Sequence, residues 1–322
     1  MQLPFLTKYK PVFFQDYIDE NEIISFLKVL VSIDSLNILF IGNSGSGKTT
    51  MINTIIKEYY KDLDVPSETI DSNILYINSL KEQGIHYYRN NVKTFCQTTS
   101  AIKGKKKIIV LDDIDYINEQ SQQVFRNCID KYSQNVHFIA SCFNVQKVID
   151  SIQSRIFIIK IKPHKEEKLI TILDNIIDKE GITMSLNCKK KLVTMSNYSI
   201  RILINYLEKL KLVGDKVTPT LIEKICNNIC FEDFKKYLDL CVVKQDVQNA
   251  SRLFLDIYEK GYSVIDILDN FFIYVKSCEE LTENQKYQII PIICKYISVF
   301  YNVHEDEVEL VLFTNSLVKL FK

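Results

Sequence analysis

The chain has 322 residues, of which 47% are hydrophobic and 25% are charged, a mixture typical of a globular protein with two or three domains. Lys and Arg together number 40, as do Asp and Glu, so the formal net charge is zero. This balance argues against a uniformly basic protein that coats nucleic acid, although it is compatible with a local basic face.

Residues 1–163 alternate short apolar runs with segments of helical spacing. The runs are rich in β-branched residues and predict strands over Ile38–Ile41, Ile74–Asn78, Lys107–Leu111, His137–Cys142 and Ile156–Ile161. The segments between them predict helices over Glu22–Val31, Thr49–Tyr60, His86–Thr98 and Glu119–Tyr132. Because most of the runs are apolar nearly throughout, we expect both faces of each strand to be covered. The alternation therefore predicts an α/β fold with a parallel sheet and right-handed crossovers.

After Pro163 the strand signals stop and helical spacing takes over. It predicts helices over Lys165–Lys179, Leu186–Met195, Ser199–Val213 and Thr218–Asn228. From Phe231 to Lys322 the pattern is again helical, and we expect Gly261 and Pro291 to interrupt the helices there. We therefore predict an α/β domain followed by two helical domains, over residues 1–163, 164–228 and 229–322.

A glycine-rich loop lies between the first predicted strand and the helix after it. Its residues fit the phosphate-loop pattern G-x-x-x-x-G-K-T: Gly42, Asn43, Ser44, Gly45, Ser46, Gly47, Lys48 and Thr49, followed by Thr50. Backbone N–H groups of such a loop turn inward on a phosphate chain, and the positive end of the helix adds to them. Lys48 should reach the β- and γ-phosphates, and the Thr49 hydroxyl should ligate Mg²⁺. The alternative, a turn that matches by chance, leaves the flanking strand and helix unexplained.

A second acidic motif follows the strand that ends at Leu111. Asp112 can hold Mg²⁺ through water at the carboxyl edge of the sheet. Asp113 stands where a base could orient an attacking water. Two solvated acids at a strand end are the alternative, which the phosphate loop upstream makes weaker.

The nine cysteines form no C-x-x-C pair, and Cys226 and Cys230 have no His nearby to complete a zinc set. We expect reduced thiols and an intracellular protein. The N-terminus has no apolar core of signal-peptide length, and no apolar run approaches about 18 residues, so we expect no membrane span.

Several segments carry, in order and at the right spacing, a resemblance to one family. They are Lys8–Pro11 (K-Y-R-P in the family), Phe14–Tyr17 (F-x-D-hydrophobic), Gln83–Lys93 (R-G-I-x-x-V-R-x-x-I-K), Gln122–Arg126 (Q-Q-A-L-R), Ile152–Arg155 (ending in S-R-C), Ser199–Asn205 (D-M-R-x-A-L-N) and Gly261–Ile267 (G-Y-S-x-x-D-I). The chain resembles an AAA+ ATPase, and more narrowly the small subunits of replication factor C type sliding-clamp loaders. The resemblance implies an AAA+ P-loop domain, a helical lid and a helical collar that joins subunits.

The resemblance also implies roles for single residues. Arg155 would be an arginine finger that enters a neighbouring subunit's ATP site, where a guanidinium stabilises charge on the γ-phosphate. Without the resemblance, a surface salt bridge would be the preferred reading of Arg155. Arg201 would be a second sensor that reaches from the lid to the nucleotide of its own subunit, or otherwise an exposed Arg in a first helical turn. Four residues would lie near the adenine, or equally in an ordinary core: Tyr9, Pro11, Tyr17 and Ile18.

The family lines its DNA channel with the helix that contains Arg89 and Lys93. These cations are four residues apart and share a helix face, which suits a phosphate backbone as well as a solvated surface. The basic run Lys103–Lys107 is interpreted as a solvated loop instead.

The sequence departs from the family pattern at two hydrolysis positions. Asp113 replaces the usual glutamate and is one methylene shorter, and a displacement of about 1 Å can cost on the order of 10²-fold in rate. Phe143 occupies the position of the sensor-1 asparagine, although Asn144, one residue later, could serve after a small shift of the strand end. We therefore expect a subunit that binds ATP well and hydrolyses it slowly.

The implied function is ATP-dependent loading of a sliding clamp onto primer–template DNA. The implied partners are the other subunits of a hetero-pentamer, the clamp and the DNA, and the cofactors are ATP and Mg²⁺. The protein should act at the site of DNA replication, which is the nucleus in a eukaryote or a cytoplasmic site for some viruses. Two alternative functions remain. One is a scaffold subunit that binds ATP only to hold the structure together, and the other is a different AAA+ machine such as an origin-binding initiator or a branch-migration motor. Residues 231–322 show only helices, which counts against those machines, since they usually carry a winged helix.

Overall fold

The computed structural model describes residues 3–17, 22–61, 63, 65–78, 87–214, 217–226, 229–278, 280–300 and 303–321. The chain divides into two compact units. The first contains Met1–Ile182 and Tyr198–Val213, and the second contains Thr183–Asn197 and Gly214–Lys322. The division into three domains at residues 163 and 228 stays a prediction. Each unit is described by itself below.

The first unit is built on a five-stranded parallel sheet with the order β2-β3-β4-β1-β5. Its strands are β1 (Ile38–Ile41), β2 (Ile74–Asn78), β3 (Lys107–Asp112), β4 (Val136–Cys142) and β5 (Phe157–Lys160). Every residue of the central strand β4 is buried, as expected for a parallel strand covered on both faces. The predicted α/β fold is confirmed, and each predicted strand end lies within one residue of the observed one.

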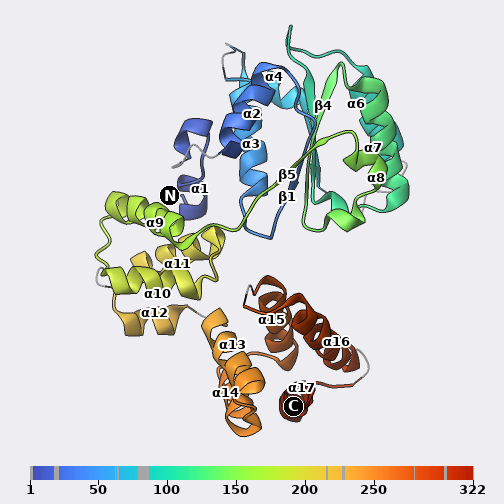
Figure 1. Cartoon of the computed structure of the whole chain (residues 1–322). Coiled ribbons are helices and arrows are strands. Elements are labelled where there is room, and N and C mark those ends of the chain that lie inside the picture. Colours follow the sequence, from blue (N-terminus) through green and yellow to red (C-terminus); the bar gives the residue numbers. More distant parts are fainter. Residues whose placement is uncertain are drawn as a thin grey trace. The chain divides into compact units, whose positions relative to one another are not determined.

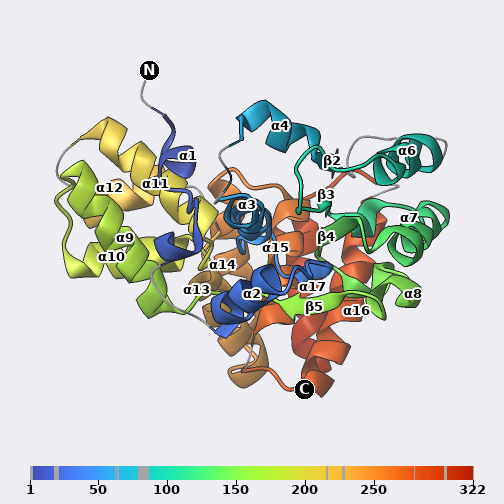
Figure 2. The same ribbon diagram turned by 90° about the horizontal axis from the view of Figure 1, so that it is seen from above.

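Helices cover both faces of this sheet (Figure 1). One face carries α2 (Glu22–Ser32), α3 (Lys48–Tyr59) and α4 (Ser67–Ser72), and the other carries α6 (Lys93–Gln97), α7 (Glu119–Tyr132) and α8 (Asp150–Gln153). Figure 2 shows α6, α7 and α8 together on their side of the strands. Leu27 of α2 and Ile55 of α3 pack into the core with Phe40 on one face, whereas Phe125 of α7 packs with Phe138 on the other. The three layers leave the carboxyl ends of the strands, where the predicted motifs lie, open at one edge.

The N-terminal segment is tied to two helices that follow the sheet in the sequence. The remaining elements of this unit are α1 (Phe5–Lys8), α9 (Glu166–Glu180), α11 (Ile200–Val213) and the short turns η1 (Phe14–Asp16), η2 (Tyr88–Val92), η3 (Ile114–Tyr116) and η4 (Val145–Lys147). The Glu180 carboxylate accepts hydrogen bonds from Lys8 Nζ at 2.6 Å and from the Tyr9 hydroxyl. Lys211 Nζ of α11 donates to the Glu180 carbonyl at 3.0 Å. One end of α9 thus holds both α11 and the start of the chain.

The second unit is helical throughout the residues that the structure describes. It contains α10 (Leu186–Met195), α12 (Pro219–Ile225), α13 (Phe231–Leu238), η5 (Asp239–Val243), α14 (Val247–Glu259), α15 (Val264–Ser277), α16 (Glu283–Val299) and α17 (Val308–Leu320). Its core is aromatic, and Tyr237 stacks on Phe254 with ring centroids 3.6 Å apart. The buried Tyr237 hydroxyl is 2.9 Å from Thr314 Oγ1, so its polar group is satisfied. The prediction that residues 231–322 form helices agrees with these elements.

Two expectations from the sequence are wrong. Pro291 does not interrupt the last unit but lies inside α16, where the buried Ile289 and Ile293 on either side hold the helix against its neighbours. The basic run before β3 is not simply solvated, because Lys107 is buried and its Nζ donates to the Thr98 hydroxyl at 2.5 Å. Among the described residues, no helix is long and apolar enough to cross a membrane, and no cluster of three or more His, Cys, Asp or Glu residues could hold a metal ion.

Candidate nucleotide site

The loop between β1 and α3 has the conformation that a phosphate loop requires. Gly45 and Gly47 have φ angles of 75° and 94°, in the left-handed region that favours glycine. Lys48 is buried, and its Nζ donates to the carbonyls of Gly42 at 2.8 Å and Asn43 at 3.1 Å. Ser46 Oγ is buried and has no hydrogen-bond partner among the described residues. The ammonium thus lies inside the loop with an unpaired hydroxyl in the same loop, an arrangement that suits a polyphosphate.

The acidic end of β3 lies beside this loop. Thr49 Oγ1 is 3.2 Å from Asp112 Oδ2, so the structure brings together the two predicted Mg²⁺ ligands. Ser141 of β4 donates to the other oxygen, Asp112 Oδ1, at 2.6 Å. A hydroxyl beside a carboxylate is the oxygen-ligand set that Mg²⁺ prefers, so these residues fit the ion. Sequence reasoning missed Ser141, although a hydroxyl near the carboxyl end of a mostly apolar strand could have pointed to it.

Asp113 stands in a distinct environment from Asp112. Its backbone is left-handed with φ 56°, and its N–H donates to Ser141 Oγ at 2.9 Å. Partial burial, followed by the negative charge of Asp112, raises the pKa of Asp113 above its ordinary value. A carboxylate with a raised pKa is a stronger base, which agrees with the predicted role of orienting water.

The loop after β4 is held by Asp115 and by the side chain of Asn144. Asp115 Oδ2 accepts hydrogen bonds from the backbone N–H groups of Phe143 at 3.2 Å and Asn144 at 3.0 Å. The Asn144 side-chain oxygen accepts from Gln146 N at 3.0 Å and caps the turn η4. The Phe143 side chain is 47% exposed. The amide predicted as a substitute sensor is therefore engaged in its own turn.

The residues predicted near the adenine fall into two groups. The Thr54 hydroxyl on α3 is 3.4 Å from the Pro11 carbonyl and from the Tyr17 hydroxyl, and it donates to the Thr50 carbonyl at 3.0 Å. Pro11, Tyr17 and Thr50 therefore lie together beside the first turns of α3. Tyr9 instead bonds Glu180 of α9, as described above. Ile18 lies outside the described residues.

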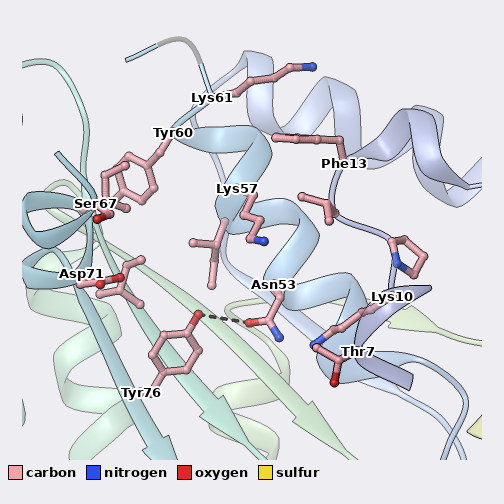
Figure 3. Close-up of a pocket in the computed structure, with 15 residues that line it drawn as sticks. Thr7, Lys10, Phe13, Asn53, Lys57, Tyr60, Lys61, Ser67, Asp71 and Tyr76 are labelled. Carbon is pink, nitrogen blue, oxygen red and sulfur yellow. Dashed lines mark hydrogen bonds between the residues drawn. The ribbon is translucent and has the colours of Figure 1, made fainter. Parts of the chain in front are cut away.

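The N-terminal segment forms one wall of a cavity of about 490 Å³ (Figure 3). Its walls come from residues 7–13, α3, α4 and β2, and Tyr76 donates to Asn53 Oδ1 at 3.1 Å across it. Burial and the positive charge of Lys57 lower the pKa of Lys10, while Asp112 opposes this shift. Lys10 therefore lies within electrostatic reach of the acidic end of β3.

The start of α11 lies against the phosphate loop. A Cβ atom placed on Gly45 would lie 2.9 Å from Ser199 Oγ and 3.8 Å from Arg201 Cβ. The structure thus brings Arg201 close to the loop, as the second-sensor role requires. Only a glycine at position 45 leaves room for this approach.

Arg155 does not point into the nucleotide site of its own chain but bonds residues of α7 and α8. Its Nε donates to Asp130 Oδ1 at 2.5 Å, and its Nη1 donates to the Ser151 carbonyl at 2.6 Å. This separation from the phosphate loop is compatible with action on another subunit.

Arg89 and Lys93 are both exposed, while Tyr88, Val92 and Cys96 on the same segment are buried. The predicted helix over residues 86–98 begins as the π-helical turn η2 and continues as α6. His86 lies outside the described residues. The two cations thus share the solvent face of this segment, as predicted.

The parallel sheet, the phosphate loop after β1 and the acidic end of β3 define a P-loop ATPase of the AAA+ class. A family model described as "ATPase family associated with various cellular activities (AAA)" matches residues 38–163. The fold is also similar to that of the Thermotoga maritima RuvB Holliday junction branch migration motor, with a TM-score of 0.54 and 13% identity over 74% of this chain and 80% of that one. At this identity the likeness concerns the fold alone.

A second family model, "Replication factor C C-terminal domain", matches residues 217–297. The replication factor C small subunit of Methanococcus maripaludis is 31% identical over 91% of each chain. A putative replication factor C small subunit of Acanthamoeba polyphaga mimivirus is 28% identical over 90% of this chain and 89% of its own length. Replication factor C subunit 5 of Homo sapiens is 28% identical over 85% and 79%. The chain belongs to the family of replication factor C small subunits, and its predicted membership of the clamp-loader ATPases is confirmed.

Proposed function

We propose that this chain is a clamp-loader subunit that binds ATP with Mg²⁺, hydrolyses it slowly at its own site, and supplies Arg155 to the site of a neighbour. Its partners are the other subunits of a hetero-pentamer, a ring-shaped sliding clamp and primer–template DNA. It acts inside the cell, at the site of replication. Differential affinity of the ATP and ADP states for clamp and DNA drives the cycle of loading and release.

The built phosphate loop supports tight nucleotide binding. Lys48 and the loop N–H groups would hold the phosphates, and Thr49 and Asp112 would hold Mg²⁺, which neutralises charge on the phosphates when bound. Arg201 lies beside Gly45 and would contact the nucleotide from α11. Pro11, Tyr17 and Thr50 offer a surface for the base beside α3.

Slow hydrolysis is supported by the identity of two residues next to this loop, Asp113 and Phe143. Asp113 has a side chain one methylene shorter than glutamate, and Phe143 has no polar atom with which to orient water. Asn144 uses its side-chain oxygen in the cap of η4. Binding groups are thus complete while groups for turnover are altered.

Apolar side chains on the last helix support assembly through residues 229–322. One face of α17 is buried in its own unit, while Val308, Val311 and Leu312 on the other are 56%, 37% and 46% exposed. These spacings place the three on one side of the helix. Such a face suits a contact with other subunits in a collar.

The test is single-turnover ATP hydrolysis in the assembled complex, comparing the wild type with Asp113→Glu. The longer side chain moves the carboxylate toward the usual position, so we expect a faster rate with an unchanged ATP affinity. Equal rates in the two proteins would overturn slow hydrolysis through Asp113.

A further inference from the structure

A small ion cluster surrounds Asp130 on the surface of the first unit. Asp130 lies on α7, and its side chain is 37% exposed. Arg155 Nε lies 2.5 Å from Oδ1, and Arg126 Nε of the same helix lies 3.3 Å from Oδ2. These two cations, mainly Arg155, hold the pKa of the Asp130 carboxyl below its usual range. The carboxylate is therefore charged at neutral pH and faces one arginine with each oxygen.

The guanidinium of Arg155 is held through two of its three nitrogens. Nε bonds Asp130, while Nη1 donates to the Ser151 carbonyl at 2.6 Å and to Ser154 Oγ at 3.2 Å. Three contacts from two elements, α7 and the end of α8, define the plane of the group. Within the part of the chain that the structure describes, Nη2 donates to none of these partners. Nη2 is not one of the buried polar atoms that have no partner, and 30% of the side chain is exposed, so we take this nitrogen to be reachable from solvent.

We propose that Asp130 is the positioning residue for Arg155: it holds the guanidinium at Nε so that Nη2 is presented to a phosphate of the nucleotide bound by a neighbouring subunit. The inference rests on the proposed role of Arg155 as an arginine finger. A planar fork that is already oriented loses less conformational entropy when it meets a phosphate than a freely rotating side chain does. Arg126 supports the arrangement through its positive charge, since its Nε forms an ion pair with the second oxygen of the same carboxylate at 3.3 Å without a hydrogen bond.

If this ion pair had a purely structural role, removing Asp130 would lower the thermal midpoint of the chain and leave turnover unchanged. We expect the reverse, because exposed ion pairs contribute little to folding, with a median of about 0–1 kcal/mol. A guanidinium displaced by about 1 Å, in contrast, can slow a reaction by up to about 10²-fold. Stability and turnover therefore separate the two roles.

The experiment is a double-mutant cycle on the whole chain in its assembled complex, read by single-turnover ATP hydrolysis at the site that receives Arg155. The variants are Asp130→Asn, Arg155→Ala, the double variant, and Asp130→Glu as the conservative rescue. We expect Asp130→Asn to slow turnover by about tenfold with unchanged ATP affinity, and Asp130→Glu to restore most of the rate. The double variant should be no slower than Arg155→Ala, because Asp130 acts only through Arg155.

A matched control is Asp233→Asn, which removes a partly exposed partner of Lys236 on α13 and should leave the rate unchanged. An Asp130→Asn protein with full turnover, or one whose loss persists unchanged in the Arg155→Ala background, would overturn the positioning role. Full turnover in Arg155→Ala alone would overturn the proposed arginine finger itself, so the two failures are distinct.

Discussion

The two ends of the parallel sheet treat their charged groups in opposite ways. At the carboxyl ends, Lys48 bonds only loop carbonyls, and Ser46 Oγ and Asp115 Oδ1 are buried without described partners. At the amino ends, Asp34 is surrounded by protein donors. The Tyr59 hydroxyl donates to it at 2.6 Å, and His137 Nε2 lies 3.0 Å from it.

Lys106 completes the amino-end cluster, with Nζ 3.1 Å from Asp34 Oδ2. The buried His137 is also close to Leu36 N, 3.4 Å from its Nδ1. Both ends are polar, but among the described residues Ser46 Oγ and Asp115 Oδ1 at the carboxyl end have no partner, whereas the amino-end groups named here bond one another. Groups that bond each other stabilise the fold, whereas groups left incomplete are available for a ligand. The comparison predicts that the carboxyl end controls binding and the amino end controls stability.

The largest expected effect is at the carboxyl end. Lys48→Ala removes the ammonium from the phosphate loop, and hydrogen bonds to charged groups are each worth about 1.5–3 kcal/mol. We expect ATP affinity to fall by about 10²-fold, with no drop in the thermal midpoint of the nucleotide-free chain. Equilibrium titration with a fluorescent ATP analogue and thermal unfolding measure the two quantities. If clamp loading by the assembled complex survives this change, ATP is not needed at this site and a scaffold role replaces the proposed one.

The next effect concerns pH and the amino end. Burial lowers the pKa of His137 to about 4, below the ordinary value of 6.5, so the folded state disfavours the proton. The stability that neutral His137 provides is present above pH 6.5 and is lost as pH falls toward 4. Between pH 7 and pH 5 we expect a loss of about 2 kcal/mol in the free energy of unfolding. Urea unfolding at both pH values measures it.

The control for that titration is His137→Gln, whose amide can keep both hydrogen bonds without gaining a proton. Its loss between the two pH values should be smaller by the same amount. An identical pH dependence in wild type and variant would assign the effect to other groups.

A smaller change is expected at the loop after β4. Phe143→Asn places an amide where the family has one, so we expect hydrolysis at the chain's own site to speed up by about tenfold. ATP affinity should not change, since the phosphate loop is untouched. Single-turnover kinetics and ATP titration on the complex measure both. A variant that is no faster would mean that Asp113 alone limits turnover.

The smallest effect is expected at the exposed cations of η2 and α6. Arg89→Ala and Lys93→Ala should each weaken binding of primer–template DNA several-fold, and each should lower the salt slope of binding by about one. DNA titrations at two or more salt concentrations measure the slope. An unchanged slope would mean that these cations belong to a solvated face and contact no phosphate.

The strands and long helices were predictable because their signals are local. Runs such as Ile108–Leu111 are apolar throughout, and α7 repeats its buried residues at helical spacing. The four-residue α8 and the short 3₁₀ turns were missed because three or four residues are too few to show a helical period. The π-helical turn η2 was read as ordinary helix for the same reason.

The site was predictable in its motifs and not in its contacts. The residues of the phosphate loop are neighbours in sequence, so their pattern is visible. Ser141 meets Asp112, and Arg155 meets Asp130, across separations of more than 20 residues that only the packing of the sheet and helices fixes. Similarly, no local pattern indicates that Tyr9 bonds a carboxylate at position 180.

That last contact has a practical consequence. Glu180 joins the beginning of the chain to the end of α9, and α9 to α11, where Arg201 lies. Any rotation of α11 upon nucleotide binding should therefore carry the residues around Tyr9 with it. A fluorophore attached near the first helix would report movement of α11 without touching the phosphate loop. A bulky affinity tag in the same place would hinder that movement. Assays of nucleotide exchange are therefore better made with a tag placed away from α1.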